Sequence, residues 1–382
     1  MNYISLNVKT LLDNAMNAAA LAASYKGKMD SLSFVRLLVL KGGKQAFFSA
    51  SNGAQAHTIG FEVTNTNIED TAEVLISGAK MRQILSGYRS LKSDTKATIE
   101  WSGFGAGQCT FKAGRSKLKT DTQDPEMFPA PLKINEDDCG QAFLNYATLT
   151  HAIQSARHAI PSNDVRYFLN GLNLAVQDSK LLFTGSDGHR LYRGSVESVD
   201  AKNSMNGIVP AALIDMLTSV KADSDTPCRI RMDEQGVEVV VANNLFRSNL
   251  IDGQYPNVEQ FFENEPTWLA DVEPQEVLDA LNRLQATVDE KTPAVCLDFS
   301  GEEIGLTTVC KTTVTGEDAV GGTLLTKLAK KISFNIRYLM DAINANSSQS
   351  DHVTLGYNES GQFLVVKGAE QSSESIIMSL KV

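Results

Sequence analysis

The chain has 382 residues, of which 42% are hydrophobic and 21% are charged, and its formal net charge is −10 at pH 7. These proportions are ordinary for a soluble globular protein of two or three domains, and no apolar run approaches the roughly 20 residues of a membrane-spanning helix. The acidic balance excludes a uniformly basic DNA-binding surface, because nonspecific affinity for DNA depends on Lys and Arg.

Cysteine usage and the N-terminus both indicate the cytoplasm. The five cysteines are Cys109, Cys139, Cys228, Cys296 and Cys310, and none belongs to a CxxC pair. A scattered, odd set is typical of reduced thiols. The first residues, MNYI, have neither the charged start nor the apolar core of a secretory signal. We therefore expect a cytoplasmic protein that does not depend on a membrane.

The first predicted elements along the chain are two amphipathic helices, over residues 11–24 and 78–92. The second carries Lys80, Arg82, Arg89 and Lys92 without an acidic residue among them. Such a cluster is either a solvated helix face or a surface that faces phosphate groups. The residues alone leave both interpretations open.

A glycine-rich segment, GFGAG at residues 103–107, nearly matches a dinucleotide-binding fingerprint. Its sixth position is Gln108 rather than Gly, and it joins two strand-like runs at 97–101 and 109–113 instead of a strand and a helix. We therefore predict a hairpin loop. The phosphate-binding pattern GxxxxGK[ST] is absent from the sequence.

Two shifts in composition predict domain boundaries. Residues 121–138 contain three prolines and a run of acids, and residues 259–267 contain Glu263, Glu265 and Pro266. Further amphipathic helices are predicted over 146–160, 210–221, 274–288 and 335–346. The helix pairs recur about every 125–135 residues, with alternating strands between them, which indicates duplicated domains rather than a solenoid. The sequence thus predicts an α+β protein with three similar domains, at residues 1–132, 139–263 and 267–382.

Enzymatic chemistry has little support in the sequence. Asp187 and His189 could form an acid–base pair, but Asp-Gly at 187–188 is also a strong hairpin signal. No nucleophile-elbow pattern occurs, and the five histidines lack HExxH spacing. We expect no catalytic residue, no metal and no cofactor, and a hydrolase using Asp187 and His189 is kept only as a formal alternative.

Three motifs carry a family resemblance. Residues 165–171 read VRYFLNG, residues 186–191 read SDGHRL, and residues 250–256 read LIDGQYP. Together with an apolar C-terminal strand, they resemble the bacterial sliding clamps, the beta subunits of DNA polymerase III. The resemblance covers nearly the whole chain and is weak in the first 70 residues. The triplet MFP at 127–129 is similar to the Phe-Pro turn that ends the first domain in this family.

The resemblance implies a clamp fold, in which each domain packs two helices on antiparallel sheets. It also implies a ring-shaped head-to-tail dimer, which a heterologous interface forms when its rotation closes. Such a ring encircles duplex DNA without reading its sequence and tethers the replicative polymerase, while an ATP-dependent clamp loader opens it. Other proteins with clamp-binding motifs are further implied partners, and the ring is expected to lie with the nucleoid during replication.

The resemblance also implies three sets of site residues. The groove for partner peptides would be lined by Leu169, Ser186, Gly188, His189, Arg190, Leu191, Pro256, Asn335, Tyr338, Ile376, Met378, Leu380 and Val382. The DNA-facing positions would be Lys28, Lys80, Arg82, Arg89, Asn163, Arg166 and Tyr167, with Phe168 as a further candidate. The dimer edge would join Leu118 and Thr120 of one subunit to Ala286 and Thr287 of the other.

The chain departs from the family pattern at several of these positions. Met378-Ser379-Leu380 replaces a usual Met-Pro-Met/Leu, and we expect the loss of Pro to free that backbone. Gln260 stands where a basic residue is common, and Phe168 replaces a frequent Tyr. Small or polar residues at the closing edges predict a weaker or more easily opened ring. The alternative function is therefore a clamp-fold adaptor or decoy that binds peptides without encircling DNA.

Overall fold

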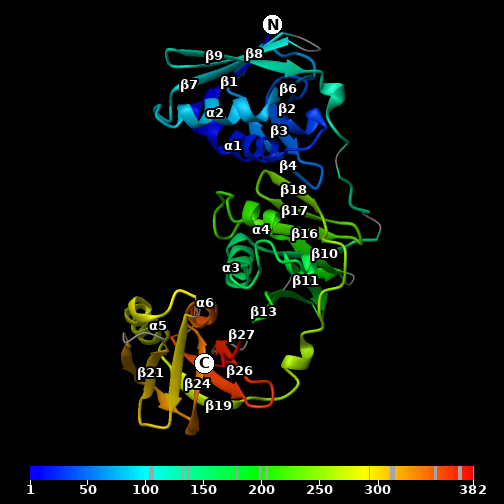
Figure 1. Ribbon diagram of the computed structural model, residues 1–382. Coiled ribbons are helices and arrows are strands. Elements are labelled where there is room, and N and C mark those ends of the chain that lie inside the picture. The colour runs from blue at the N-terminus through cyan, green and yellow to red at the C-terminus, as the bar shows by residue number, and fades with distance from the viewer. Residues whose placement is uncertain are drawn as a thin grey trace. The chain divides into compact units, whose positions relative to one another are not determined.

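The computed structural model of the protein (Figure 1) describes residues 1–102, 107–130, 132–135, 138–177, 179–197, 199–202, 205–291, 293–309, 315–347, 351–368 and 372–381. Three features predicted from the sequence fall wholly or partly outside these ranges. They are the loop at 103–106, Cys310 and the groove candidate Val382. Cys109, Cys228 and Cys296 are free thiols, as predicted.

Along the described residues, one order of elements occurs three times: strand, helix, five strands, helix, three strands. The first occurrence comprises β1 (Asn2–Asn7), α1 (Val8–Ser24), β2 (Phe34–Val39), β3 (Gln45–Ser51), β4 (Gln55–Glu62), β5 (Asn65–Thr66), β6 (Ala72–Ser77), α2 (Gly78–Tyr88), β7 (Lys96–Trp101), β8 (Gly107–Ala113) and β9 (Ser116–Gln123). Strands β7 and β8 pair antiparallel on either side of residues 103–106, in agreement with the predicted hairpin.

The second occurrence follows the same order. It comprises β10 (Gly140–Asn145), α3 (Tyr146–Arg157), β11 (Gly171–Gln177), β12 (Lys180–Ser186), β13 (Arg190–Glu197), β14 (Val199–Lys202), β15 (Met205–Pro210), α4 (Ala211–Leu217), β16 (Pro227–Met232), β17 (Gly236–Val241) and β18 (Asn244–Asn249). Helix α4 is shorter than the predicted 210–221. The Tyr146 hydroxyl lies 3.1 and 2.7 Å from the carbonyl oxygens of Leu217 and Val220, so a hydrogen-bond donor is present where the chain leaves the helix.

The third occurrence begins after the acidic boundary near residue 263. It comprises β19 (Thr267–Val272), α5 (Pro274–Leu284), β20 (Ala294–Phe299), β21 (Ile304–Val309), β22 (Glu317–Val320), β23 (Thr323–Leu324), β24 (Leu328–Asn335), α6 (Ile336–Ser347), β25 (Val353–Asn358), β26 (Phe363–Gly368) and β27 (Ser373–Met378). All six predicted helices are therefore present, and the α+β class is confirmed. The three domain boundaries stay a prediction.

The chain separates into two compact units, and each is described by itself. Unit one comprises Met1–Ala147 and Asp215–Leu250, and unit two comprises Thr148–Ile214 and Ile251–Val382. In unit one, neighbouring strands pair in the order β10-β16-β17-β18-β4-β3-β2-β6-β9-β8-β7-β1-β5. The pairing of β18 with β4, in which Asn244 lies opposite Ile59, makes this a single sheet across two of the three repeats.

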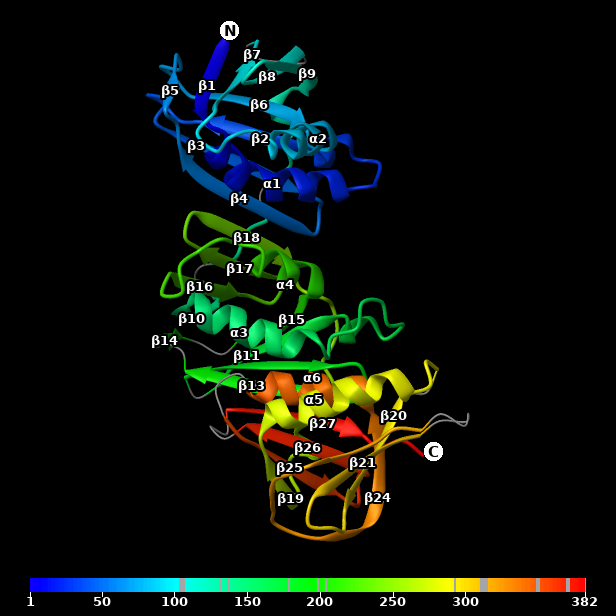
Figure 2. The same ribbon diagram turned by 90° about the vertical axis from the view of Figure 1, so that its left-hand side faces the viewer.

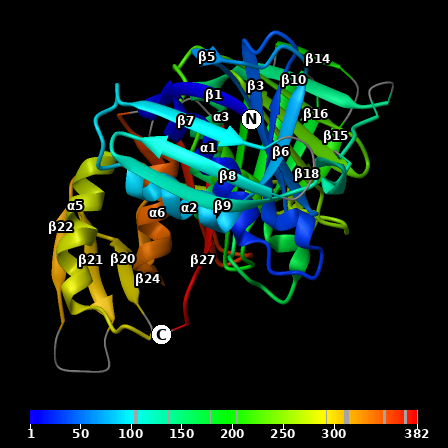
Figure 3. The same cartoon turned by 90° about the horizontal axis from the view of Figure 1, so that it is seen from above.

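In unit one the sheet curls around the helix pair α1 and α2 (Figures 2 and 3). The buried side of α1 is rich in alanine, including Ala15, Ala18 and Ala22. These small side chains let α2 approach closely. A Cβ on Gly78, the first residue of α2, would lie 2.5 Å from the Cβ of Ala22, so this contact requires glycine.

Unit two contains the pairing that builds the candidate site. Its larger sheet has the order β15-β11-β12-β13-β27-β26-β25-β19-β23, and a smaller sheet has the order β22-β21-β20-β24. Helices α5 and α6 pack side by side against these strands (Figure 2). Strand β13 pairs antiparallel with β27, with Leu191 opposite Ile376, so the C-terminal strand lies beside the SDGHRL segment.

None of the helices in the described part of the chain combines the length and apolar content that crossing a membrane requires.

A buried carboxylate organises one face of the sheet in unit one. Glu238 on β17 is 1% exposed, and it accepts hydrogen bonds from Arg231 and Arg247 on the flanking strands at 2.9 and 2.8 Å. Burial raises the pKa of the Glu238 carboxyl, but the hydrogen bonds and charges of the two arginines outweigh this, and the pKa is lowered from its ordinary value.

Replacing Glu238 with Gln is expected to reduce the free energy of unfolding by about 3 kcal/mol, because it leaves two partly buried guanidinium groups without their buried anion. Because the folded pKa is depressed, this contribution is present above the ordinary carboxyl pKa and is lost as the pH falls through the folded value. Urea unfolding near neutral pH and in acid measures both effects. The control is Glu234→Gln, an exposed position that should change stability by less than about 0.5 kcal/mol. Equal stability of the two variants would contradict the prediction.

Candidate functional site

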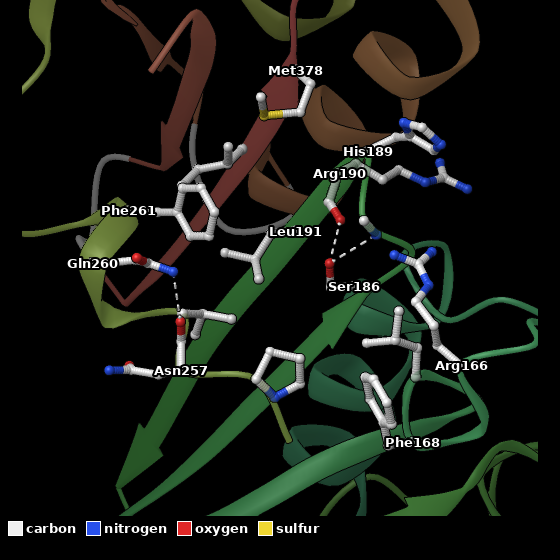
Figure 4. Close-up of a pocket in the computed structure, with 15 residues that line it drawn as sticks. Arg166, Phe168, Ser186, His189, Arg190, Leu191, Asn257, Gln260, Phe261 and Met378 are labelled. Atoms are coloured by element: carbon white, nitrogen blue, oxygen red, sulfur yellow. Dashed lines mark hydrogen bonds between the residues drawn. The ribbon is translucent and has the colours of Figure 1, made fainter. Parts of the chain in front are cut away.

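A cavity of about 360 Å³ opens in unit two beside the end of β27 (Figure 4). It is lined by Arg166, Phe168, Leu169, Ser186, Gly188, His189, Arg190, Leu191, Pro256, Asn257, Val258, Gln260, Phe261, Ile376 and Met378. Nine of these were predicted for the groove, and they come from four separate stretches of sequence. The structure therefore brings the three resemblance motifs and the terminal strand to one place.

The floor of the cavity is an apolar cluster on the paired strands. Leu191 and Ile376 are buried opposite each other, together with Phe363 and Val365 of β26. Phe261 packs on this cluster, with its ring centroid 5.9 Å from that of Phe363 in an edge-to-face arrangement. An extended peptide could bury apolar side chains here, each worth about 1.5–3 kcal/mol.

The SDGHRL segment forms the turn between β12 and β13. The Asp187 carboxylate accepts from the backbone N–H groups of His189 and Arg190, at 2.9 and 3.0 Å, and Gly188 has a φ of +85°. Ser186 closes the turn, since its Oγ accepts from the Gly188 N–H and donates to the Arg190 carbonyl (Figure 4). These bonds explain the motif as a rigid turn. Within the described residues the Asp187 carboxylate makes no hydrogen bond to the His189 imidazole, so the acid–base pair of the hydrolase alternative is not formed.

Arg190 joins this turn to helix α6. Its Nε donates to Asp187 at 2.9 Å, and its Nη1 donates to Asp341 at 2.5 Å. The guanidinium carbon lies 4.1 Å from the centroid of the Tyr338 ring. Tyr338, predicted to line the groove, therefore packs against the Arg190 guanidinium and does not line the cavity.

Three other groove candidates do not line the cavity. Asn335 is the last residue of β24, directly before α6, and its Oδ1 accepts from the backbone N–H of Arg337 at 3.0 Å. Leu380 lies past the end of β27 and forms a bridge with Ser333. Val382 is outside the described residues.

The expectation that Ser379 frees the terminal backbone is wrong. Its N–H donates to the carbonyl of Gln362 at 2.9 Å. The neighbouring N–H groups are also held, because Met378 donates to His189 at 2.9 Å and Leu380 donates to Ser333 at 2.7 Å. Pro has no N–H and could not make the central bond. The substitution thus adds a constraint beside Met378, which lines the cavity.

Arg166, predicted to face DNA, lies at the rim of the cavity (Figure 4). Its side chain donates to both carboxylate oxygens of Asp164, at 3.0 and 2.8 Å, and to the Asp187 carbonyl at 2.8 Å. The hydrogen bonds from Arg166 lower the pKa of Asp164 to about 2, so this pair stays charged near neutral pH. A Cβ on Gly188 would lie 2.5 Å from Nη1 of Arg166 and would displace the end of that side chain, whereas the φ of +85° is what favours glycine in this turn.

The other DNA-facing candidates lie apart from the cavity lining. Asn163 and Tyr167 are exposed in the loop before β11, where Val165 is also 96% exposed. Lys28 is exposed after α1. Lys80, Arg82 and Arg89 are exposed on α2 or at its end, and none makes an ion pair with another described residue.

The dimer-edge candidates lie on two different units. Leu118 and Thr120 belong to β9, whose pairing with β6 involves only Thr122 and Gln123, so the outer edge of residues 116–121 has no strand partner among the described residues. Ala286 and Thr287 lie in a 3-10 turn after α5, at Gln285–Thr287.

Part of the cavity wall was not predicted from the sequence. Asn257, Val258, Gln260 and Phe261 line it, and Phe168 does so although it was considered only as a DNA contact. The signal was present: an apolar pair, Phe261-Phe262, interrupts the acidic boundary. Among the described residues no group of three or more His, Cys, Asp or Glu could hold a metal ion.

Comparison with known proteins identifies the family. The model of the DNA polymerase III beta subunit central domain matches residues 143–257, and that of the C-terminal domain matches residues 260–381. The chain belongs to the DNA polymerase III beta subunit family. The curated beta sliding clamp of Staphylococcus aureus (strain Mu50 / ATCC 700699) is 24% identical over 327 residues, which cover 82% of this chain and 81% of the relative.

Solved structures of this family share the fold. The sliding clamp from Pseudomonas aeruginosa bound to griselimycin superposes with a TM-score of 0.88 at 20% identity, and covers 100% of both chains. The sliding clamp from Bacillus subtilis gives a TM-score of 0.87 at 18% identity, with 100% of this chain and 99% of that chain covered. The predicted clamp fold is therefore confirmed.

Replacing Ser379 with Pro removes the N–H that donates to Gln362. We expect the free energy of unfolding to fall by about 1 kcal/mol, the usual value of one hydrogen bond. Thermal unfolding of the variant measures the loss. Ser379→Ala is the matched control, because it removes only the hydroxyl and keeps the N–H. If the two variants unfold at the same temperature, the bond to Gln362 does not hold this segment.

Proposed function

We propose that the protein is a DNA sliding clamp, a non-catalytic processivity factor that encircles duplex DNA and tethers a replicative polymerase through a peptide groove. The observation that carries the proposal is the cavity on the β13–β27 pairing, which residues of both matched family segments line. An apolar floor with polar groups at the rim suits an extended peptide, because burial supplies affinity and the polar groups fix its direction.

Partner proteins would enter the groove through a short segment with apolar anchors. Leu191, Ile376 and Phe261 offer the surface for these anchors. The clamp of Pseudomonas aeruginosa has been solved with griselimycin bound. We propose that the same compound would bind this groove, which makes it a practical competitor for partner peptides.

DNA would be contacted chiefly through the cations of α2 and its end. Lys80, Arg82 and Arg89 are exposed and carry no ion pair among the described residues, so their charge is available to phosphate groups. Arg283 on α5, in contrast, donates to Asp318 at 2.8 Å. The exposed ring of Tyr167 and the Asn163 amide add contacts of the kind that hold a backbone without reading bases.

The ring would close through two strand edges of opposite charge. The free edge of β9 carries exposed Lys117 and Lys119 on either side of Leu118. Strand β22 is the edge of its sheet and begins with the exposed Glu317, and the preceding Gly316 packs against Thr287. In a head-to-tail dimer these edges of two copies would pair, and the lysines would face the acid.

Loading would require a separate ATP-driven loader, and the working location would be the cytoplasm, at the nucleoid during replication. The chain would bind other clamp-binding proteins in turn, since one groove per subunit serves all of them. The adaptor or decoy alternative keeps the groove and lacks encirclement. It therefore differs from the clamp in one measurable property, retention on closed DNA.

Retention on circular DNA tests the proposed function. The protein is loaded onto nicked circular duplex by a bacterial clamp loader with ATP, and gel filtration in high salt follows. We expect protein to stay with the circle, because a closed ring is held by topology rather than by charge, and to leave when the DNA is cut to a linear form. Protein that fails to stay on the circle, while still binding griselimycin, would support the adaptor instead.

A control variant distinguishes electrostatic contact with DNA from retention by a closed ring. The variant Lys80→Ala/Arg82→Ala/Arg89→Ala should bind DNA more weakly and with a smaller dependence on salt, because fewer counterions are released. Once loaded, it should still leave only when the circle is cut.

Charge reversal tests the closing edges. Lys117→Glu/Lys119→Glu should weaken dimerisation at least about ten-fold, because like charges then face Glu317. Adding Glu317→Lys should restore it. Light scattering over a concentration series measures the mass against 41.5 kDa for one chain. Lys44→Glu, an exposed position away from β9, is the control. A reversal variant that dimerises as well as the wild type would disprove this edge, and a wild type that stays monomeric would favour the adaptor.

A further inference from the structure

Arg193 holds a chain segment that borders the groove, although it does not itself line the cavity. It lies two residues after Leu191 on β13, so both side chains point to the same face of the sheet. The segment 257–262 crosses this face. Its residues Val258, Gln260 and Phe261 line the cavity, while Glu259 and Phe262 contact Arg193.

Three contacts converge on the Arg193 guanidinium. Its Nη1 donates to Glu259 at 2.7 Å, and its Nη2 donates to Glu374, the residue opposite it on β27, at 2.6 Å. Its central carbon lies 3.6 Å from the centroid of the Phe262 ring. One side chain thus fastens segment 257–262 to both strands that carry the cavity floor.

The contacts of Arg193 affect the cavity wall through neighbouring residues of segment 257–262. Glu259 and Phe262, which contact Arg193, are immediate neighbours of the cavity-lining residues Val258, Gln260 and Phe261, so the Arg193 contacts help to hold these residues at the cavity. Phe261 also packs edge-to-face on Phe363. Gln260, which stands where a basic residue is common in the family, donates to the nearby Asn257 carbonyl at 3.1 Å. The wall is held by the packing of Val258, Phe261 and Phe262 on the apolar cluster and by the ion pair and ring contact of Arg193.

We infer that Arg193 is a positioning residue for partner binding: it sets the wall at 257–262 against the groove floor, so that peptide affinity depends on an ion pair outside the groove. The inference rests on the proposed peptide-binding function. Glu259 has a side chain that is 66% exposed, so its ion pair with Arg193 is open to screening by salt. The affinity of an uncharged peptide should therefore depend on ionic strength.

The chain contains a matched control in unit one. Arg36 on β2 donates to Glu73 at 2.7 Å, and its guanidinium carbon lies 5.7 Å from the centroid of the Phe128 ring, in the segment after β9. This arginine therefore makes the same types of contact with a chain segment, but it does not line or border the cavity described above.

The test uses a capped, uncharged peptide with leucine and phenylalanine anchors, and isothermal titration calorimetry on the full-length protein. Arg193→Met keeps the apolar stem but loses the ion pairs and the stacking, and should weaken binding about three- to ten-fold. Arg193→Lys should recover part of this loss, since it keeps one charge. Arg36→Met should bind like the wild type, and equal thermal unfolding of the two Met variants would exclude a general loss of folding.

The dependence of peptide affinity on ionic strength gives a second test, because a purely structural role of Arg193 would not produce it. Between about 0.05 M and 0.5 M salt, wild-type affinity should fall about two-fold further than that of Arg193→Met, because only the wild type has the ion pair to screen. If Arg193→Met bound the peptide with the affinity and the salt dependence of the wild type, the inference would be overturned. The proposed peptide-binding groove would still stand. A wild type that binds neither this peptide nor griselimycin would instead overturn the proposed function, and the inference with it.

Discussion

The antiparallel pairing of β13 with β27 is the constraint on which the candidate site depends. It sets Leu191 opposite Ile376 and lets the Met378 N–H donate to the His189 carbonyl, so the turn after β12 and the end of the chain form one surface. Neither strand would form an apolar floor alone. Since side chains alternate across a sheet, a shift of β27 by one residue against β13 would turn Ile376 to the opposite face, away from Leu191.

Ion pairs around the turn add to the apolar contacts that set this register. Arg190 lies between Asp187 on its own turn and Asp341 on α6, with its side chain 15% exposed. Burial lowers the pKa of His158 to about 4, and the charge of Arg190 adds to this effect, so His158 stays neutral near pH 7. The two carboxylates therefore face one cation, and α6 is fixed relative to the turn by an ion pair that neutral pH does not disturb.

Local patterns in the sequence predicted the helices and the hairpin strands, because each depends on residue spacing, and the family resemblance carried by the contiguous motifs implied nine cavity residues. Long-range contacts were out of reach. The bond from Ser379 to Gln362 depends on how two segments meet at the end of the sheet, and no local pattern encodes it. The apolar pair Phe261-Phe262 was visible in the acidic boundary, but the role of Phe261 comes from packing on Phe363, which no local pattern encodes. The pairing of Arg166 with Asp164 is different: two residues apart, it was visible in the sequence and was overlooked.

A net charge of −10 is compatible with a DNA-bound protein only if affinity is not what keeps it there. A protein that binds DNA from one side needs many phosphate contacts, and it dissociates as salt rises. A closed ring needs fewer phosphate contacts, and in the proposed clamp the exposed cations on α2 would supply them. Weak contacts would then favour sliding, because no phosphate is held for long. A small number of basic residues is what a topological attachment permits.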